Sequence, residues 1–181
     1  MPPSSADKLV LAQSPGVTVA LVEPRIPQNT GNIARLCAAT QAELHLVGRL
    51  GFRIDEKAVK RAGLDYWHLV SLHVHPDLRT FELKNPSSKL LLFSANGPTS
   101  YTDMDVAPGD ALVFGKESSG LPKELLARHE GRVYGIPTAG AVRSINLASA
   151  AAIVVYEALR KCSALEGARL EEDTSSEDFP R

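Results

Sequence analysis

Short apolar runs of strand type alternate along the chain with runs of helical spacing, and this alternation most constrains the fold. Strand-like runs cover residues 17–22, 44–47, 69–74, 90–93, 111–114 and 133–136. Helical spacing covers residues 29–40, 55–62, 77–83, 121–128 and 146–161. Strands separated by helices predict an α/β fold, with a mostly parallel sheet and helices on both of its faces.

The 181 residues suit one domain, which we expect over residues 17–161. Residues 1–16 indicate a flexible leader, since they lack the apolar run behind a basic start that marks a signal peptide. Residues 162–181 hold six acidic residues against two arginines, so we expect an acidic, disordered tail. No apolar stretch is long enough to span a bilayer, and the two cysteines form no disulfide framework, so we expect a cytoplasmic protein.

The net charge of −1 hides an uneven distribution, because the tail is acidic and the rest of the chain is basic. A basic cluster lies near the middle of the first half, with its cations at Arg49, Arg53, Lys57, Lys60 and Arg61. This cluster is typical either of a solvated helix face or of a patch that binds nucleic-acid phosphates.

Three loops follow strands at the edge where open α/β sheets bind ligands. The first loop leads into the helix of residues 29–40, with Asn29 or Thr30 as a candidate N-cap. Asn32 and Arg35 lie three residues apart, so they share a helix flank that is offset from the apolar stripe. We therefore expect Arg35 to project from the first turns toward the ligand edge; an ordinary solvated arginine is the alternative.

The second loop, residues 114–122, combines a turn at Gly115 with a Gly-Leu-Pro helix start. Such a turn lets backbone N–H groups approach a ligand closely. The loop has neither the spacing of a Walker loop nor that of a dinucleotide-binding glycine motif. Glu117 can bind a substrate, or it can accept hydrogen bonds from the free N–H groups of a helix.

The third loop joins the strand that ends at Ile136 to the strongest predicted helix. Its small residues allow a bound molecule to come close. Ile136, Ile145 and Leu147 can form apolar walls around an adenine, and the helix N-terminus offers unpaired N–H donors. A capped loop without a ligand is the alternative.

Together and in this order, the three segments resemble the signature of the SPOUT class of RNA methyltransferases. They are most similar to its tRNA (cytidine/uridine 2′-O)-methyltransferases of the TrmL/YibK type. The resemblance covers about residues 17–161 and rests on residues 23–35, 114–122, 136–137 and 143–147, with residues 61–66 typical of this branch. It implies a trefoil knot near the C-terminus, S-adenosylmethionine as cofactor and tRNA as partner. It also implies a homodimer that completes each active site and methylates the ribose 2′-hydroxyl of the anticodon wobble nucleotide.

The resemblance also implies roles for single residues. Arg35 is the expected catalytic residue, with Asn32 holding it in place. The implied cofactor contacts are Phe93, Gly115, Ile136, Ser144, Ile145 and Leu147. The implied substrate contacts are Asn29, Glu117 and Arg143, and Tyr156 is expected at the dimer interface.

Two other functions remain open on the sequence. One is a 2′-O-methyltransferase for another tRNA position or for ribosomal RNA. Relatives with such targets often carry an additional RNA-binding domain before the catalytic one, and only about 16 residues precede the first predicted strand here. The other is a non-catalytic RNA-binding module on the same fold.

The five histidines are scattered along the chain. His73 and His75 alternate along one predicted strand, but the sequence shows no third ligand beside them. We therefore expect no metal.

Overall fold

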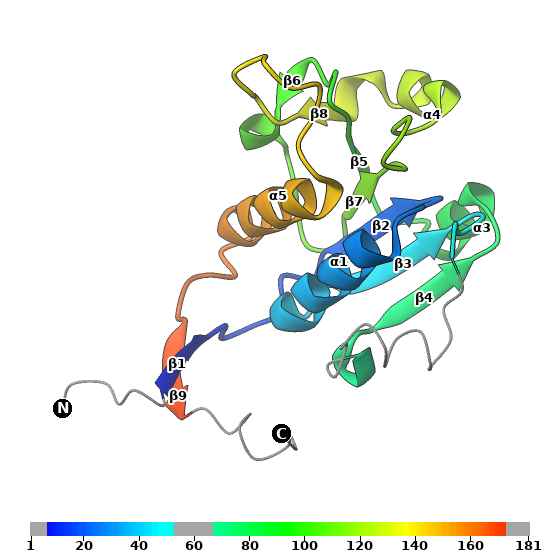
Figure 1. The fold of residues 1–181 in the computed structure, drawn as a ribbon. Coiled ribbons are helices and arrows are strands. Elements are labelled where there is room, and N and C mark those ends of the chain that lie inside the picture. Colours follow the sequence, from blue (N-terminus) through cyan, green and yellow to red (C-terminus); the bar gives the residue numbers. More distant parts are fainter. Residues whose placement is uncertain (1–6, 53–66, 173–181) are drawn as a thin grey trace.

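The computed structural model describes residues 7–52 and 67–172 of the chain. Its main element is a parallel sheet of seven strands (Figure 1). Across the sheet the strands are β4 (Leu72–His75), β3 (Glu43–Val47), β2 (Thr18–Val22), β7 (Ala111–Phe114), β5 (Leu90–Phe93), β8 (Val133–Gly135) and β6 (Thr99–Ser100).

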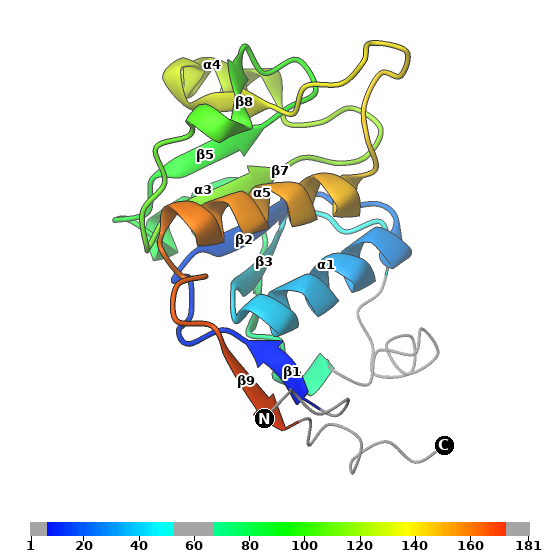
Figure 2. The same ribbon diagram turned by 90° about the vertical axis from the view of Figure 1, so that its left-hand side faces the viewer.

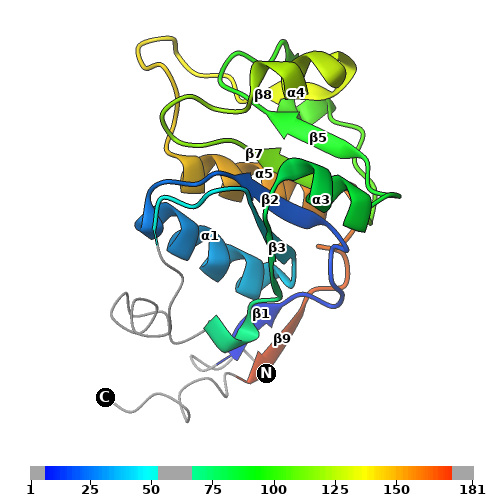
Figure 3. The ribbon, with the colours of Figure 1, turned by 90° about the vertical axis from the view of Figure 1, so that its right-hand side faces the viewer.

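Helices cover both faces of this sheet (Figures 2 and 3). On one face lie α1 (Pro27–Thr40) and α5 (Leu147–Lys161), and on the other lie α3 (Leu78–Lys84) and α4 (Lys123–Arg128). Because side chains alternate along a strand, Leu21 of β2 packs in the α1–α5 core while Ala20 packs in the α3–α4 core. The predicted α/β fold with helices on both faces is confirmed.

The central strands β2, β5 and β7 are buried along their whole length. Parallel strands covered on both faces are expected to be apolar throughout, and these are the runs that the sequence marks most clearly. Among the elements, β5 and β7 have the predicted bounds. The predicted helix at residues 55–62 lies outside the described residues, as do four cations of the basic cluster and the segment 61–66.

Some elements differ from the prediction. A 3-10 turn at Trp67–Leu69 takes the start of a predicted strand, and β4 begins only at Leu72. The strand β6 was not predicted, because two residues carry no periodicity. Helix α1 begins at Pro27 rather than Asn29, since proline at the first helical position has a suitable φ and needs no N–H partner.

Both ends of the described chain meet in a separate two-stranded sheet below the main one (Figures 1 and 2). Strand β1 (Asp7–Val10) pairs antiparallel with β9 (Arg169–Glu172). These eight residues therefore form a strand pair inside the segments for which the sequence predicts a flexible leader and a disordered tail. Leu9 stands opposite Leu170 and Lys8 opposite Glu171, and such apolar and opposite-charge pairs stabilise a ladder.

Among the described residues, no helix is long and apolar enough to cross a membrane. The trefoil knot implied by the resemblance stays a prediction.

Candidate functional site

Three neighbouring strands end level with one another at the predicted ligand edge. In the sheet β7, β5 and β8 are adjacent, and Phe93 of β5 is in register with Phe114 on one side and Tyr134 on the other. The predicted cofactor residues Gly115 and Ile136 directly follow two of these strand ends. This edge therefore brings together segments that are far apart in the sequence.

The Phe93 side chain is part of the core beneath this edge. Its ring stacks on that of Phe114, with ring centroids 5.0 Å apart, and lies 5.9 Å from the ring of Tyr134. It is 7% exposed, so most of its surface contacts protein rather than solvent. A ligand at this edge would therefore meet mainly the backbone of Phe93.

Backbone segments pass unusually close to one another at Gly115 and Gly97. A Cβ atom on Gly115 would lie 2.1 Å from the carbonyl carbon of Gly120, and one on Gly97 would lie 2.1 Å from that of Tyr134. The second loop also closes on itself, since the Gly120 N–H donates to the Lys116 carbonyl at 2.8 Å. Only glycine fits at either position, which explains the glycine turn after β7.

The carboxylate of Glu117 ties the second loop to the backbone ahead of α1. It accepts hydrogen bonds from the Arg25 N–H at 2.9 Å, from the Ile26 N–H at 3.1 Å and from Nδ2 of Asn29 at 3.1 Å. Glu117 therefore accepts hydrogen bonds from N–H groups at a helix start, which is one of the two roles that the sequence predicts for it. The helix is α1, which precedes Glu117 by about 90 residues, and not the helix that follows it.

These bonds control the charge of Glu117. Burial raises the pKa of its carboxyl group, but the hydrogen bonds from the backbone N–H groups of Arg25, Glu117 itself and Ile26, and from Asn29, outweigh burial and lower the pKa below its ordinary value. Glu117 is therefore ionised at neutral pH, as a hydrogen-bond acceptor at this position needs to be.

Asn29 extends the connection to the third loop. Its Oδ1 accepts from Nδ2 of Asn146 at 3.0 Å, and Oδ1 of Asn146 accepts from the Ala148 and Ser149 N–H groups at 2.8 and 3.3 Å. Asn146 is thus the N-cap of α5. The expectation of Asn29 or Thr30 as N-cap of α1 is wrong, because Ile26 holds that position and both residues are buried within the helix.

A second polar contact joins the second loop to the segment ahead of α1. Nζ of Lys116 donates to Oε2 of Glu23 at 2.7 Å, and the Arg25 guanidinium lies 3.7 Å from the same oxygen. The hydrogen bond from Lys116 lowers the pKa of the Glu23 carboxyl. Glu23 has a φ of 50°, a left-handed conformation that few non-glycine residues adopt, and these ion pairs help hold it.

Asn32 and Arg35 lie exposed on α1, while Ile33, Ala34 and Cys37 are buried against the sheet. Their common flank is therefore offset from the apolar stripe, as predicted. Arg35 is not in the first turns, however. Because α1 begins at Pro27, Arg35 lies in the third turn, about 12 Å along the axis from the helix start.

The third loop leaves its polar side chains in solvent. Arg143 and Ser144 are exposed, whereas Ile145 is half-buried. Ile136 and Leu147 are half-buried against the α1–α5 core. Apolar surface is thus present where the sequence predicts walls for a ligand.

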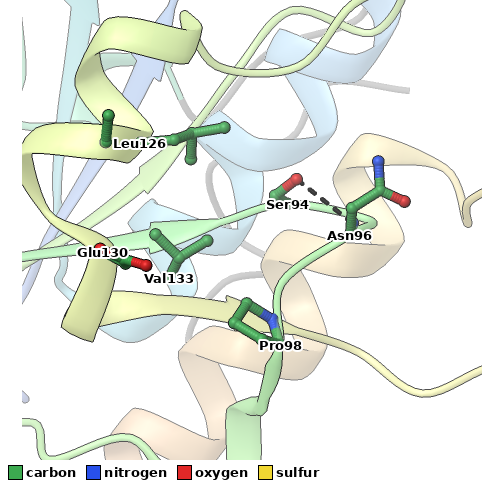
Figure 4. Close-up of a pocket in the computed structure, with 7 residues that line it drawn as sticks. Ser94, Asn96, Pro98, Leu126, Glu130 and Val133 are labelled. Carbon is green, nitrogen blue, oxygen red and sulfur yellow. Dashed lines mark hydrogen bonds between the residues drawn. The ribbon is translucent and has the colours of Figure 1, made fainter.

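A cavity of about 420 Å³ opens beside β5, on the side of α4 (Figure 4). Ser94, Asn96 and Pro98 from the segment after β5 lie opposite Leu126 and Val133, and the Asn96 N–H donates to Oγ of Ser94 at 3.3 Å. None of the six predicted cofactor residues lines this cavity. It adjoins the ligand edge without being the predicted pocket.

On the outer face of α5, Tyr156 is 50% exposed and Ile153 is 37% exposed. Val154 and Val155 beside them are fully buried in the core of the same chain. The helix thus presents an apolar strip to solvent on the side away from its own sheet.

Sequence reasoning missed three residues of this arrangement: Asn146, Glu23 and Lys116. Asn146 carried a usable signal, since asparagine directly before an apolar helical run is a common N-cap. Glu23 and Lys116 carried none, because their contact joins residues more than 90 positions apart.

A family model for the SpoU rRNA methylase family matches residues 16–156. A protein of Geobacillus stearothermophilus is 47% identical over 148 residues, covering 80% of this chain and 94% of its own. A tRNA (cytidine(34)-2′-O)-methyltransferase of Burkholderia ambifaria is 43% identical over 155 residues, covering 83% of this chain and 98% of its own. The chain belongs to the SpoU rRNA methylase family.

Solved structures agree with this assignment. A structure that concerns 2-OH methylation of C/U34 on tRNA matches with a TM-score of 0.75 and 44% identity, covering 80% of this chain and 95% of its own. An AdoMet-bound rRNA methyltransferase from Sinorhizobium meliloti matches with a TM-score of 0.71 and 30% identity, covering 82% of this chain and 57% of its own.

The pKa shift of Glu117 predicts a pH-dependent stability. A lowered pKa stabilises the folded protein above the ordinary value of 4.5, and this contribution is lost as the pH falls through the folded-state pKa. Glu117→Gln should cost about 1–3 kcal/mol at pH 7, toward the low end because the group is partly exposed. The difference in unfolding free energy between the variant and the wild-type protein should shrink in acid. Urea unfolding from pH 7 into acid measures this difference, with the exposed residue Glu124 of α4, changed to Gln, as the control. A difference that does not depend on pH contradicts a stabilising role for the Glu117 charge.

The close approach at Gly115 predicts that Gly115→Ala destabilises the protein. Its Cβ has no space beside the Gly120 carbonyl carbon, so the loop must shift, at a cost of about 1–3 kcal/mol. Gly131→Ala is the matched control, because a Cβ there meets nothing within 4 Å, and its stability should be unchanged or slightly higher. Equal unfolding midpoints for the two variants would show that the loop is not tightly packed.

Proposed function

We propose that this chain transfers a methyl group from S-adenosylmethionine to the ribose 2′-hydroxyl of nucleotide 34, the wobble cytidine or uridine of tRNA. One observation carries the proposal most. Asn29 hydrogen-bonds to both Glu117 and Asn146, so one chain of hydrogen bonds joins the three loops of the sequence signature. The names of similar proteins support the substrate, since a relative 43% identical acts on cytidine 34 of tRNA.

The ligand edge has features that suit S-adenosylmethionine. Close backbone packing at Gly97 and Gly115 holds the loops of this edge together, and Ile136, Ile145 and Leu147 offer apolar surface for an adenine. We assign the cofactor to the backbone of Phe93, Gly115 and Ile136, with Ser144, Ile145 and Leu147 completing the pocket. When bound, S-adenosylmethionine supplies an electrophilic methyl group on a sulfonium sulfur.

Arg35 orients the nucleophile in this proposal. A guanidinium stays protonated in proteins, so Arg35 acts by hydrogen bonding to the ribose hydroxyl or a neighbouring phosphate rather than as a base. Asn32 shares its flank and helps to hold it. With S-adenosylmethionine bound, the cofactor would supply its methyl group to the hydroxyl oxygen that Arg35 orients, S-adenosylhomocysteine would leave, and the hydroxyl proton would pass to water or to a phosphate. Holding the two reactants in line supplies much of the acceleration.

The substrate contacts divide into two kinds. Arg143 is exposed and can reach an RNA phosphate directly. Asn29 and Glu117 already bond to protein groups, so we propose that they position the loops that the RNA contacts.

We also propose a homodimer formed through the apolar strip of α5. Tyr156 and Ile153 are large apolar side chains exposed next to one another on one helix face, which favours a protein partner. A second copy would bring its own α1 and third loop close to this surface and so complete each site.

Ribosomal RNA is the second candidate substrate. The rRNA methyltransferase from Sinorhizobium meliloti shares the fold at 30% identity, against 42–47% for the relatives described as acting on cytidine 34. The identities therefore favour tRNA.

Methyl transfer to total tRNA, with ribose methylation mapped in the product, tests the proposal. Arg35→Ala should reduce turnover at least tenfold while S-adenosylmethionine binding, measured by calorimetry, survives. Arg35→Lys should recover only part, because an ammonium cannot make a forked contact. Arg79→Ala on the opposite face of the sheet is the control and should retain wild-type turnover. Wild-type turnover in Arg35→Ala would remove Arg35 from the mechanism.

The dimer proposal predicts that Tyr156→Ala weakens self-association more than Tyr156→Phe, since only the first removes the apolar ring. Sedimentation at micromolar concentration measures the monomer fraction. Leu83→Ala, which truncates another exposed apolar side chain, is the control. If both Tyr156 variants sediment like that control, Tyr156 has no major part in association.

A further inference from the structure

On the opposite face of the sheet, three side chains of metal-binding type converge at its β4 edge. Within the described ranges, Glu43, His45 and His73 each offer one ligand atom, and these three atoms lie within 4.8 Å of one another. Nε2 of His45 is 3.2 Å and Nε2 of His73 is 4.0 Å from the same oxygen, Oε2 of Glu43. All three therefore point toward one small volume.

Strand geometry accounts for this convergence. His45 and His73 are paired residues of the parallel strands β3 and β4, so their side chains leave the sheet on the same face. Glu43 lies two residues before His45 and shares that face. The expectation of no metal rested on the lack of a third ligand beside His73 and His75. Strand pairing instead places Glu43 and His45 of β3 beside His73.

A further histidine holds the ring of His45 in place. Nδ1 of His45 is 2.9 Å from Nε2 of the buried His75, and the two rings stack with an interplanar angle of 12°. Phe81 of α3 packs edge-on against both rings, each with a centroid separation of 5.3 Å. With its Nδ1 engaged by His75, His45 presents only Nε2 toward Glu43. Metal-binding histidines are commonly oriented by such a contact at the other ring nitrogen.

The tautomer of His45 decides what its Nε2 atom can bind. With the hydrogen on Nε2, His45 donates to Oε2 of Glu43 at 3.2 Å, and its Nδ1 accepts from Nε2 of His75 at 2.9 Å. With the hydrogen on Nδ1, His45 donates to His75, and Nε2 has a lone pair for a metal ion between it and the carboxylate. Metal binding therefore requires the second tautomer.

We propose that Glu43, His45 and His73 bind one divalent transition-metal ion, with His75 as a positioning residue for His45. Two imidazoles and one carboxylate form a ligand set typical of Zn²⁺, and a water molecule can take the fourth position. Tetrahedral ligands at about 2.0–2.2 Å from zinc lie roughly 3.3–3.5 Å apart. Glu43 and His73 are about half exposed, so small rotations of their side chains close the remaining gap.

The site is separate from methyl transfer. It lies on the α3 face of the β3–β4 pair, whereas Arg35 lies on α1 across the sheet. A metal here joins the edge strand β4 to β3 and stabilises that edge. Lys84 lines the same cavity of about 510 Å³, and its positive charge opposes a bound cation.

Calorimetry with Zn²⁺ on untagged, chelator-treated protein tests the proposal. One Zn²⁺ per chain should bind. Glu43→Gln and His73→Ala should each weaken binding at least tenfold, and His75→Ala should weaken it about 10–100-fold. Both Glu43 and His73 are exposed, so their variants should fold normally. Lys84→Ala should instead tighten binding severalfold, and His68→Ala, which removes an exposed histidine elsewhere, should leave it unchanged.

Thermal unfolding gives an independent readout. Zn²⁺ at about 100 times its dissociation constant should raise the Tm of the wild-type protein by roughly 5–10 °C, and this rise should be lost in His73→Ala. Absence of stoichiometric binding overturns the proposal. So does binding that survives both Glu43→Gln and His73→Ala, since the metal would then lie elsewhere.

Discussion

The carboxylate of Glu117 is the contact on which the arrangement of the site depends. It receives two backbone N–H groups ahead of α1 and the amide of Asn29, which in turn contacts the N-cap residue of α5. Loops after parallel strands have few contacts of their own, and unpaired N–H groups at helix starts are costly when partly buried. One ionised group thus satisfies several donors and holds three loops in a single arrangement.

The sheet separates two chemistries by the alternation of its side chains. Along β3, Leu44 and Leu46 pack toward α1, which carries Arg35, while His45 points toward α3 and the histidine cluster. The proposed methyl transfer and the proposed metal site thus use opposite faces of one strand. Because each face has its own core, a change at one site has little direct contact with the other.

Sequence periodicity located the central strands well and long-range contacts poorly. Residues 90–93 and 111–114 are strands with the predicted bounds, because strands buried on both faces are apolar at every position. The pairing of β1 with β9 escaped prediction, since it joins the two ends of the described chain and neither run is strongly apolar. Asn29 looked like a helix cap, and only the fold shows that its amide lies between Glu117 and Asn146.

By itself, the sequence determined the α/β class, the order of the longer helices and strands and the three loops of the family signature, because these depend on local periodicity and on residues close together in the chain. The tertiary structure decided which loops touch, which ring nitrogens face a carboxylate and where Arg35 lies along its helix. The physical reason is the parallel sheet. Its strand order brings together residues that are far apart in the sequence, such as Glu23 and Lys116. Local patterns contain no information about that order.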